Sequence, residues 1–238
     1  MIRTILFDLD RTLLYMDQNK FLDLYFSQLV AWLVARGYDK EAVQQHIMGG
    51  TMAMIRNDGS RLNERAFWDY FSNACGVDVS TALPVFEDFY REVFPKVVEE
   101  SCAPDSAAKD VVERLKGEGY SLVLATNPLF PPMATECRIR RAGLLPSDFI
   151  HRTTYENASY SKPNPAYYRE ILEKLSLRAE ECLMVGNDAE EDMAAEKAGL
   201  RVFLRTDYLI NPKGLDISGY PQGGFPELLT FLAEQKEK

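Results

Sequence analysis

Short apolar runs alternate with helix-like stretches over much of the chain. The first run is Thr4–Phe7, and four later runs that combine β-branched, aliphatic or aromatic residues span 120–125, 149–153, 182–185 and 201–204. Such runs are typical of buried strands. Residues 107–116, 165–175 and 190–198 have helical character, with proline at the start of the second and glycine after the first and third. This alternation predicts an α/β fold, a doubly wound parallel sheet with helices on both faces.

Residues 17–100 have a different pattern. Strand-like runs are missing there, and helix-forming, aromatic-rich sequence dominates, around 21–33, 42–54, 64–74 and 82–98. We expect a helical subdomain over 17–100, inserted into an α/β core made of 1–16 and 101–238. Its aromatic residues are best explained as packing. Because the chain must cross between core and insert near Met16 and near Glu100, we expect a two-stranded hinge.

Composition narrows the class of partner. The 238 residues are enough for a substantial core, and 46% hydrophobic with 26% charged residues is ordinary for a globular protein. A net charge of −9 argues against a nucleic-acid or anionic-membrane surface, since both reward excess Lys and Arg. An anionic substrate stays open, because a bound metal and a few donors can invert the field locally.

The cysteines point to a reducing compartment. Four cysteines show no C-x-x-C spacing, and the chain has only two histidines, which argues against a structural zinc site. Reduced thiols in a cytoplasmic protein are the expected state. Residues 1–3, Met-Ile-Arg, pass directly into the first strand without a signal-peptide pattern, and no apolar segment has the length of a membrane span.

Two carboxylates close the first strand. Asp8 and Asp10 follow Thr4–Phe7, and side chains two apart on an extended chain point the same way. Two anions held this close invite a shared proton or a bound cation. An ordinary turn would also explain them. A calcium loop would not, because Leu13 and Asn19 fall where its turn glycine and bidentate glutamate belong.

Polar groups follow the next two strands as well. Thr126 and Asn127 come after 120–125, and a hydroxyl and an amide can both bond phosphoryl oxygens. Lys162 follows 149–153 between Ser161 and Pro163, on a loop that proline restricts, and a fixed ammonium can neutralise carboxylates or a transferring phosphoryl group. Each has an alternative, a turn for Thr-Asn-Pro and a solvated surface lysine for Lys162.

The fourth strand ends in an acidic segment. If a helix begins near Asp188, then Asp188 and Asp192 lie one turn apart on the same side. Glu190 and Glu191 are then explained by the helix dipole. In parallel sheets, ligands bind beyond the carboxyl ends of the strands, which is where all these polar groups fall. Their joint placement predicts an active site there.

These motifs resemble those of the haloacid dehalogenase (HAD) superfamily, most of whose members are Mg²⁺-dependent phosphohydrolases. Residues 8–12, Asp-Leu-Asp-Arg-Thr, look like the D-x-D-G-T signature. Thr126 looks like the Ser/Thr of the second motif, Lys162 like the lysine of the third, and 187–192 like the acidic fourth motif. All four occur in the family's order, and the helical insert lies where members with a C1-type cap carry it. The resemblance implies a Rossmann-like core with a helical cap.

The resemblance also implies roles for the core residues. Asp8 is then the nucleophile that accepts the phosphoryl group, and Asp10 the acid/base that protonates the leaving oxygen and later activates water. Thr126 binds phosphoryl oxygens, with Asn127 beside it, and Lys162 steadies Asp8 and the developing charge. The substrate is then a small phosphorylated metabolite. Nothing in the insert's sequence identifies which one.

The magnesium ligands implied by the resemblance are Asp8, the backbone carbonyl of Asp10 and Asp188, with Asp192 close behind. The sequence reads Gly-Asn-Asp where Gly-Asp is commoner in the family, so Asn187 or Asp188 could hold the first acidic position. We expect Asp188 to bind the metal, because a hard divalent ion prefers anionic oxygen. Asn187 is then free to bond Lys162 or to cap the next helix, and Asp192 to orient water or pair with Lys162.

One further departure is Arg11, which stands where the family usually has glycine. The turn after Asp10 must therefore tolerate a side chain, and we expect that side chain to project to solvent. Alternative functions remain: a phosphomutase shares every core residue. A dehalogenase does not need Asp10, and a non-catalytic binding protein would be expected to lack the nucleophile or the lysine, whereas this chain has both.

Overall fold

The computed structural model describes residues 1–236. Within them, parallel strands form a six-stranded sheet in the order β5-β4-β1-β6-β7-β8. The strands of this sheet are β1 (Thr4–Phe7), β4 (Ser121–Leu124), β5 (His151–Arg152), β6 (Cys182–Gly186), β7 (Arg201–Arg205) and β8 (Gln222–Gly223). The predicted α/β fold is confirmed. The four later runs all contain strands, although those expected at 120–125 and 149–153 are shorter than the apolar runs.

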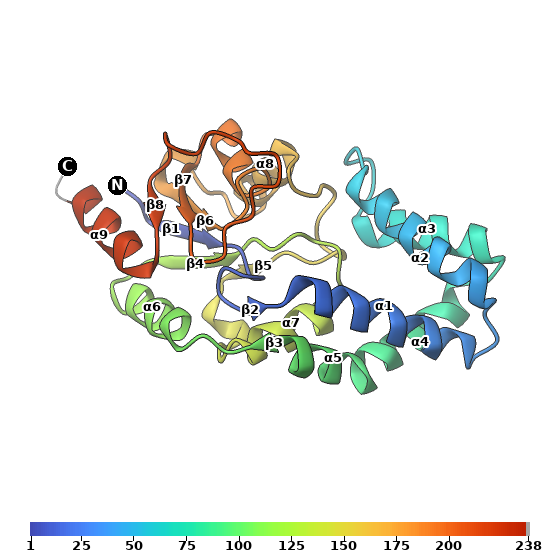
Figure 1. Ribbon diagram of the computed structural model, residues 1–238. Helices are drawn as coiled ribbons and strands as arrows, with labels where there is room; N and C mark the ends of the chain where they lie inside the picture. Colours follow the sequence, from blue (N-terminus) through green and yellow to red (C-terminus); the bar gives the residue numbers. More distant parts are fainter. Residues whose placement is uncertain (237–238) are drawn as a thin grey trace.

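Helices cover both faces of the sheet (Figure 1). They are α6 (Ser106–Gly117), α7 (Pro132–Arg141), α8 (Pro165–Lys174) and α9 (Phe225–Lys236), with short 3₁₀ helices η1 (Pro146–Asp148), η2 (Ala179–Glu181) and η3 (Met193–Ala198). Alternate residues of β1 face opposite ways: Ile5 and Phe7 pack in the cluster that includes α6, α7 and α9, and Leu6 packs with α8 and η3. Burial on both faces explains why the central strands are apolar throughout.

The segment between the first strand and the rest of the core is helical. It contains α1 (Gln18–Val34), α2 (Lys40–Ile55), α3 (Asn63–Cys75), α4 (Val79–Glu92) and α5 (Phe94–Ser101). The single stretch expected over 82–98 is two helices, because the chain breaks at Val93 and α5 opens with Pro95 near its start. Proline fits a first helical turn and disrupts an interior one.

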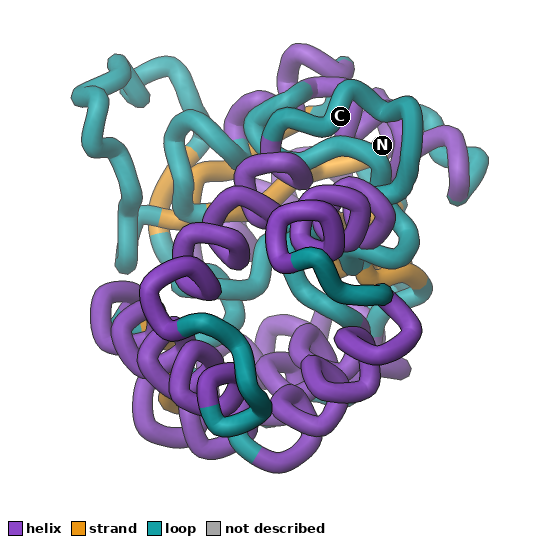
Figure 2. The backbone as a smooth tube through the Cα atoms, turned by 90° about the vertical axis from the view of Figure 1, so that its right-hand side faces the viewer, coloured by secondary structure: helices purple, strands orange, loops and turns teal. Residues whose placement is uncertain are grey.

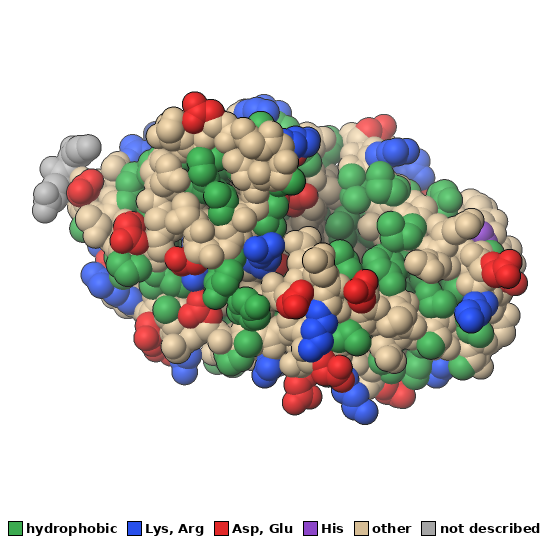
Figure 3. All heavy atoms as spheres, viewed as in Figure 1, with side chains coloured by type: hydrophobic (Ala, Val, Ile, Leu, Met, Phe, Trp, Pro, Cys, Tyr) green, Lys and Arg blue, Asp and Glu red, His purple; other side chains and the backbone are tan. Residues whose placement is uncertain are grey.

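Two short strands join this helical insert to the core. β2 (Tyr15–Met16) pairs antiparallel with β3 (Cys102–Ala103), Tyr15 opposite Ala103 and Met16 opposite Cys102. The chain therefore leaves and re-enters the core through adjacent segments, as the expected hinge requires. Seen from the side of the insert, its helices lie in front of the strands (Figure 2). The surface is hollowed between core and insert, and hydrophobic side chains gather on the insert's side (Figure 3).

Candidate active site

Asp8 lies at the carboxyl end of β1, between the ends of β4 and β6. Its backbone N–H donates to the carbonyl of Val185 at 3.0 Å, which continues the parallel ladder one residue past the strand. The chain then turns, with the N–H groups of Leu13 and Leu14 donating to the carbonyl of Leu9 at 2.8 and 2.9 Å. This turn holds Asp10 at the same edge of the sheet as Asp8.

The backbone conformation of Arg11 accounts for the glycine that the resembling family usually has at this position. Its φ is 64°, in the left-handed region, which costs a non-glycine residue on the order of 1 kcal/mol. The turn adopts this conformation regardless, held by its internal hydrogen bonds and by the buried leucines on either side, Leu9 and Leu13. The Arg11 side chain is half-buried, not freely exposed as expected.

Lys162 joins the two carboxylates nearest to it. Its ammonium lies 2.9 Å from Asp8 Oδ1 and 2.6 Å from Asp192 Oδ1, and the residue is only 2% exposed. Burial alone lowers the pKa of Lys162, but the charges of Asp192 and Asp8 outweigh it and hold that pKa well above the ordinary value. The lysine is therefore a permanent cation, and a solvated surface lysine is excluded.

Burial and neighbouring charges shift the pKa values of Asp8 and Asp10, the two aspartates that follow β1. Burial raises the pKa of Asp8 to about 7; Asp192 and Asp10 add to the rise and Lys162 opposes it. Burial also raises the pKa of Asp10, against the pull of Arg138 and Lys162. Asp10 Oδ1 is buried without a hydrogen-bond partner among residues 1–236. A further positive charge nearby would stabilise the ionised form of both carboxyls.

Arg138 on α7 was not identified from the sequence. It is 1% exposed, and its Nη1 donates to Asp10 Oδ2. Its guanidinium also stacks over Phe130, 4.6 Å from the ring centroid. Helical spacing could have revealed it, because the buried residues Ala134 and Ala142 lie four positions to either side on the same face of the chain.

Thr126 and Asn127 lie where the sequence predicts, beyond β4. The Thr126 carbonyl accepts from Thr153 Oγ1 at 2.6 Å and from the Tyr167 hydroxyl at 2.9 Å, which fixes the backbone. Asn127 Oδ1 accepts from the backbone N–H of Lys162 at 3.3 Å, and its amide donates to Glu191 at 3.1 Å. Asn127 thus ties the loop of the second motif to the loop that carries Lys162.

The acidic segment after β6 differs from the expected helix. Asp188 forms an isolated β-bridge with Ile210, residues 189–192 form turns, and only Met193–Ala198 is helical, as the 3₁₀ helix η3. Asp188 Oδ1 accepts from the N–H groups of Glu190 and Glu191, both at 2.8 Å, and Asp192 Oδ2 accepts from the Asp188 N–H at 2.9 Å. These side-chain bonds satisfy the backbone in place of a helical ladder.

Gly186 permits Asp192 to approach the strand. A Cβ at Gly186 would lie 2.2 Å from Asp192 Cγ, so any other residue would displace the carboxylate from Lys162. Asn187 does not bond Lys162 and does not cap η3, contrary to expectation. Its Oδ1 accepts from Thr12 Oγ1 at 3.1 Å, and its Nδ2 donates to the carbonyl of Tyr208 at 2.6 Å. Asn187 therefore holds the turn after β1 against the loop after β7.

The residues present fit a hard divalent cation. Among residues 1–236, no three His, Cys, Asp or Glu side chains are arranged, as they stand, so that they could hold a metal ion. The unsatisfied Asp10 Oδ1 and the raised pKa of Asp8 and of Asp188, due mainly to burial, nevertheless mark an excess of negative charge. Carboxylate oxygens are the ligands that Mg²⁺ prefers.

Comparisons with known proteins agree with this geometry. The family model of haloacid dehalogenase-like hydrolases matches residues 2–199. Similar proteins include a ribulose-1,5-bisphosphate 5-phosphatase from Halopiger xanaduensis, 28% identical over 86% of this chain and 84% of that protein. A phosphoglycolate phosphatase from Vibrio parahaemolyticus is 27% identical over 85% of this chain and 82% of its own.

Solved structures share the fold. A 2-haloacid dehalogenase from Pseudomonas syringae has a TM-score of 0.64 and 20% identity, over 99% of this chain and 100% of that one. A HAD phosphatase from Thermococcus onnurineus has a TM-score of 0.58 and 19% identity, over 97% and 98%. Among residues 1–236, no helix is both long and apolar enough to cross a membrane.

Proposed function

The chain belongs to the haloacid dehalogenase-like hydrolases, and we propose that it is a Mg²⁺-dependent phosphohydrolase that cleaves a small phosphomonoester through a phosphorylated aspartate. One observation carries the proposal: Lys162 is buried between Asp8 and Asp192 at the carboxyl end of β1, with Asp10 two residues further on. The relatives named as phosphatases support the same reaction class.

The first step transfers the phosphoryl group to the enzyme. A carboxylate oxygen of Asp8 attacks phosphorus, the bond to the ester oxygen breaks, and protonated Asp10 donates its proton to the leaving oxygen. The raised pKa of Asp10, due to burial, favours the protonated form that this step needs. Lys162 and the Thr126 hydroxyl then bond phosphoryl oxygens and offset the charge that builds up there.

The second step releases phosphate. Asp10, now a carboxylate, takes a proton from water as the water oxygen attacks phosphorus. The bond from phosphorus to Asp8 breaks, which regenerates the Asp8 carboxylate and frees inorganic phosphate. Asp192 keeps Lys162 charged and in place through both steps, at 2.6 Å. We assign Asp192 as a positioning residue for Lys162.

Mg²⁺ would be held by Asp8, the carbonyl of Asp10 and Asp188, and it would screen the repulsion between the Asp8 carboxylate and a phosphate dianion. Residues 17–100 would form the cap, and 1–16 with 101–238 the catalytic core, the cap closing through the β2–β3 pair to exclude water during transfer. The four cysteines are all unpaired, which favours a cytoplasmic location.

Phosphate release from an activated aryl phosphate tests the proposal. We expect turnover at saturating Mg²⁺ and its loss in excess chelator, with restoration when Mg²⁺ is returned. A panel of phosphorylated metabolites under the same conditions would then rank natural substrates. Full activity in chelator, or no release from any ester in the panel, would refute the proposed function.

A further inference from the structure

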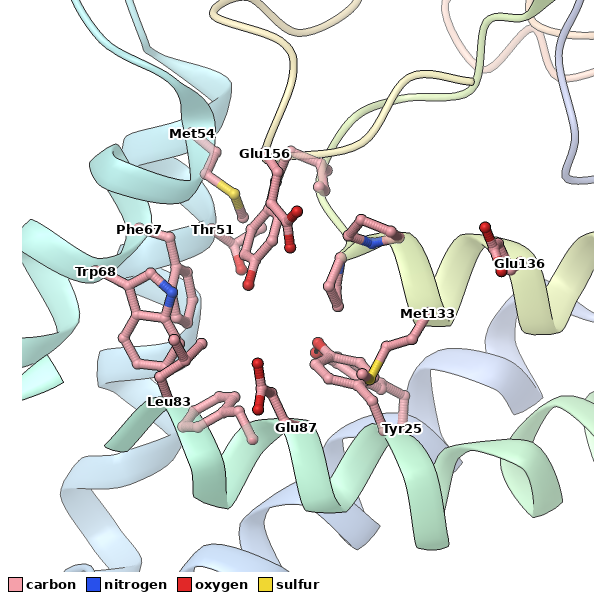
Figure 4. Close-up of a pocket in the computed structure, with 16 residues that line it drawn as sticks. Tyr25, Thr51, Met54, Phe67, Trp68, Leu83, Glu87, Met133, Glu136 and Glu156 are labelled. Carbon is pink, nitrogen blue, oxygen red and sulfur yellow. Dashed lines mark hydrogen bonds between the residues drawn. The ribbon is translucent and has the colours of Figure 1, made fainter. Parts of the chain in front are cut away.

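A cavity of about 300 Å³ lies between the helical insert and the core, within the size range of small-ligand sites. Its walls come from α1 to α4 on one side and from the loops after β4 and β5 and the start of α7 on the other (Figure 4). Six of its lining residues are aromatic: Tyr25, Phe67, Trp68, Phe86, Tyr90 and Tyr155.

The cavity adjoins the residues assigned to catalysis. Met54 lines it, and the Met54 carbonyl accepts from Ser161 Oγ at 3.2 Å, one residue before Lys162. Leu129 also lines it, and the Leu129 N–H donates to the Asn127 carbonyl at 2.9 Å. Both walls are thus attached to the loops that carry the phosphate-binding groups, so the cavity is placed to receive the alcohol part of a bound phosphoester.

The charges of this cavity are one-sided. Glu87 rises from α4 and Glu156 descends from the loop after β5, and both carboxylates point into the space (Figure 4). Neither forms an ion pair within the described part of the chain, and among residues 1–236 no Lys, Arg or His lines the cavity. Glu136, at the rim, is instead paired with Arg152 at 3.5 Å.

The like charges also act on one another. Burial raises the pKa of Glu156, and the negative charges of Glu64 and Glu87 raise it further. A cation in the cavity would relieve this repulsion, whereas a second anionic group on the substrate would add to it. Phosphoglycolate, which appears in the name of one relative, carries such a group.

Trp68 gives an independent sign of a ligand. The residue is 4% exposed, and its buried Nε1 makes no hydrogen bond of standard geometry among residues 1–236, although the Tyr155 hydroxyl lies nearby. In Figure 4 its indole forms part of the cavity wall, with Phe67 beside it. A buried indole N–H normally finds an acceptor, so the site is one hydrogen bond short of complete. An oxygen of a bound ligand could supply it.

We infer that this cavity selects a phosphomonoester whose alcohol carries an ammonium group, an inference that rests on the proposed phosphohydrolase function. Aromatic walls attract a desolvated cation through their ring faces, and quaternary ammonium groups are bound in this way. Glu87 and Glu156 supply the opposing charge. The phosphoryl end reaches Asp8 and Lys162, and the ammonium end occupies the aromatic cavity.

The test compares two esters that differ in one charge. Phosphocholine and 3,3-dimethylbutyl phosphate have nearly the same shape, with a quaternary nitrogen in one replaced by carbon in the other. We expect kcat/KM to favour phosphocholine by about tenfold or more, as one cation–π contact with a facing carboxylate supplies. A ratio of one or below in the wild-type protein would overturn the inference.

Paired variants assign the preference to the cavity. In the double variant Glu87→Gln, Glu156→Gln the ratio of the two kcat/KM values should fall toward one. Because both esters are measured on the same protein, a partial folding defect cancels from the ratio. Glu92→Gln removes one negative charge from α4, as Glu87→Gln does, but outside the cavity, and it should leave the ratio unchanged. An equal fall in both proteins would refute the role of Glu87 and Glu156.

A binding measurement separates this inference from the proposed function. Calorimetric titration with choline should show binding that 3,3-dimethylbutanol does not match, and it needs no turnover. Choline binding in a protein that hydrolyses no ester would support the cavity and refute the phosphohydrolase. Mg²⁺-dependent hydrolysis of an aryl phosphate, with no preference for phosphocholine or choline over the uncharged analogues, would support the phosphohydrolase and refute the cavity's assignment.

Discussion

The proposed catalytic edge of the core and the facing wall of the insert differ in how their charged side chains are paired. At the core edge, Lys162, Asp192 and Arg138 are buried and each is paired with an opposite charge. On the insert's side, the walls are aromatic, and Glu87 is exposed and unpaired within residues 1–236. Paired buried charges hold a fixed geometry, whereas an unpaired charge beside a cavity is available to an occupant.

This difference assigns separate tasks to the two regions. Substitutions at the core edge should lower the rate for every phosphoester, because they alter groups that we propose act on the phosphoryl group itself. Substitutions in the cavity should change the ratio between esters. The predictions below test this division, beginning with the largest effect.

Asp8→Asn should reduce kcat for every ester by at least about 10³-fold, because the amide is nearly isosteric and a poor nucleophile. Thermal unfolding should show a folded protein. Asp23→Asn, an exposed substitution of the same kind on α1, should retain full activity. Substantial turnover in Asp8→Asn would mean that another group attacks phosphorus.

Asp10→Asn should slow esters with poor leaving groups by about 10²-fold, as expected when proton donation is lost. An activated aryl ester should lose much less in its first step, because its leaving oxygen needs no proton. Single-turnover phosphorylation measured with both esters decides this. Equal losses would indicate damaged geometry, for example through the Arg138 contact, in place of lost acid catalysis.

Asp188→Ala should raise the Mg²⁺ concentration for half-maximal activity by about 10- to 100-fold, the usual range for groups that hold or orient a metal. Asn187→Ala should chiefly lower stability, because its amide bridges Thr12 and Tyr208. Titration of activity against Mg²⁺ compares the two variants. The opposite order would assign the metal to Asn187 and contradict our register.

Asn63→Ala should lower the free energy of unfolding by about 1–3 kcal/mol. It should change the rate of phosphate release less than any of the substitutions above. Asn63 is buried where α3 meets the core, and its amide donates to the Pro128 carbonyl and Ser161 Oγ, both at 3.2 Å. Its loss leaves buried acceptors unpaired. Asn73→Ala, on the exposed face of α3, is the matched control in thermal unfolding, and an equal loss there would contradict the role of the junction.

The core site could be anticipated because chain order places its residues. Asp8, Thr126 and Lys162 each follow a strand, and parallel strands end at the same edge, so sequence position implies proximity. Arg138 lies on a helix among other arginines, Arg140 and Arg141, where a solvated face is the usual interpretation. Its spacing from the buried residues Ala134 and Ala142 hints at a buried position, but only the tertiary contact with Asp10 shows its role.

The helix expected at Asp188 shows a second limit. Its composition suits a helix, but the side chains of Asp188 and Asp192 bond nearby backbone N–H groups and hold turns instead. The aromatic residues of the insert show a third limit of prediction from sequence. Most pack in its core, as expected, and which of them also border a cavity depends on how distant segments meet. Local sequence does not determine either outcome.

The central claim is that the phosphoryl group passes to Asp8, and rapid-quench trapping tests it most directly. The Asp10→Asn protein, given a labelled aryl phosphate with Mg²⁺, should accumulate label on the peptide that contains Asp8, because its first step is spared and its second lacks a base. The double variant Asp8→Asn, Asp10→Asn should carry none. Labelled phosphate released from the wild-type protein and the Asp10→Asn protein with no label on Asp8 at any quench time would contradict the account.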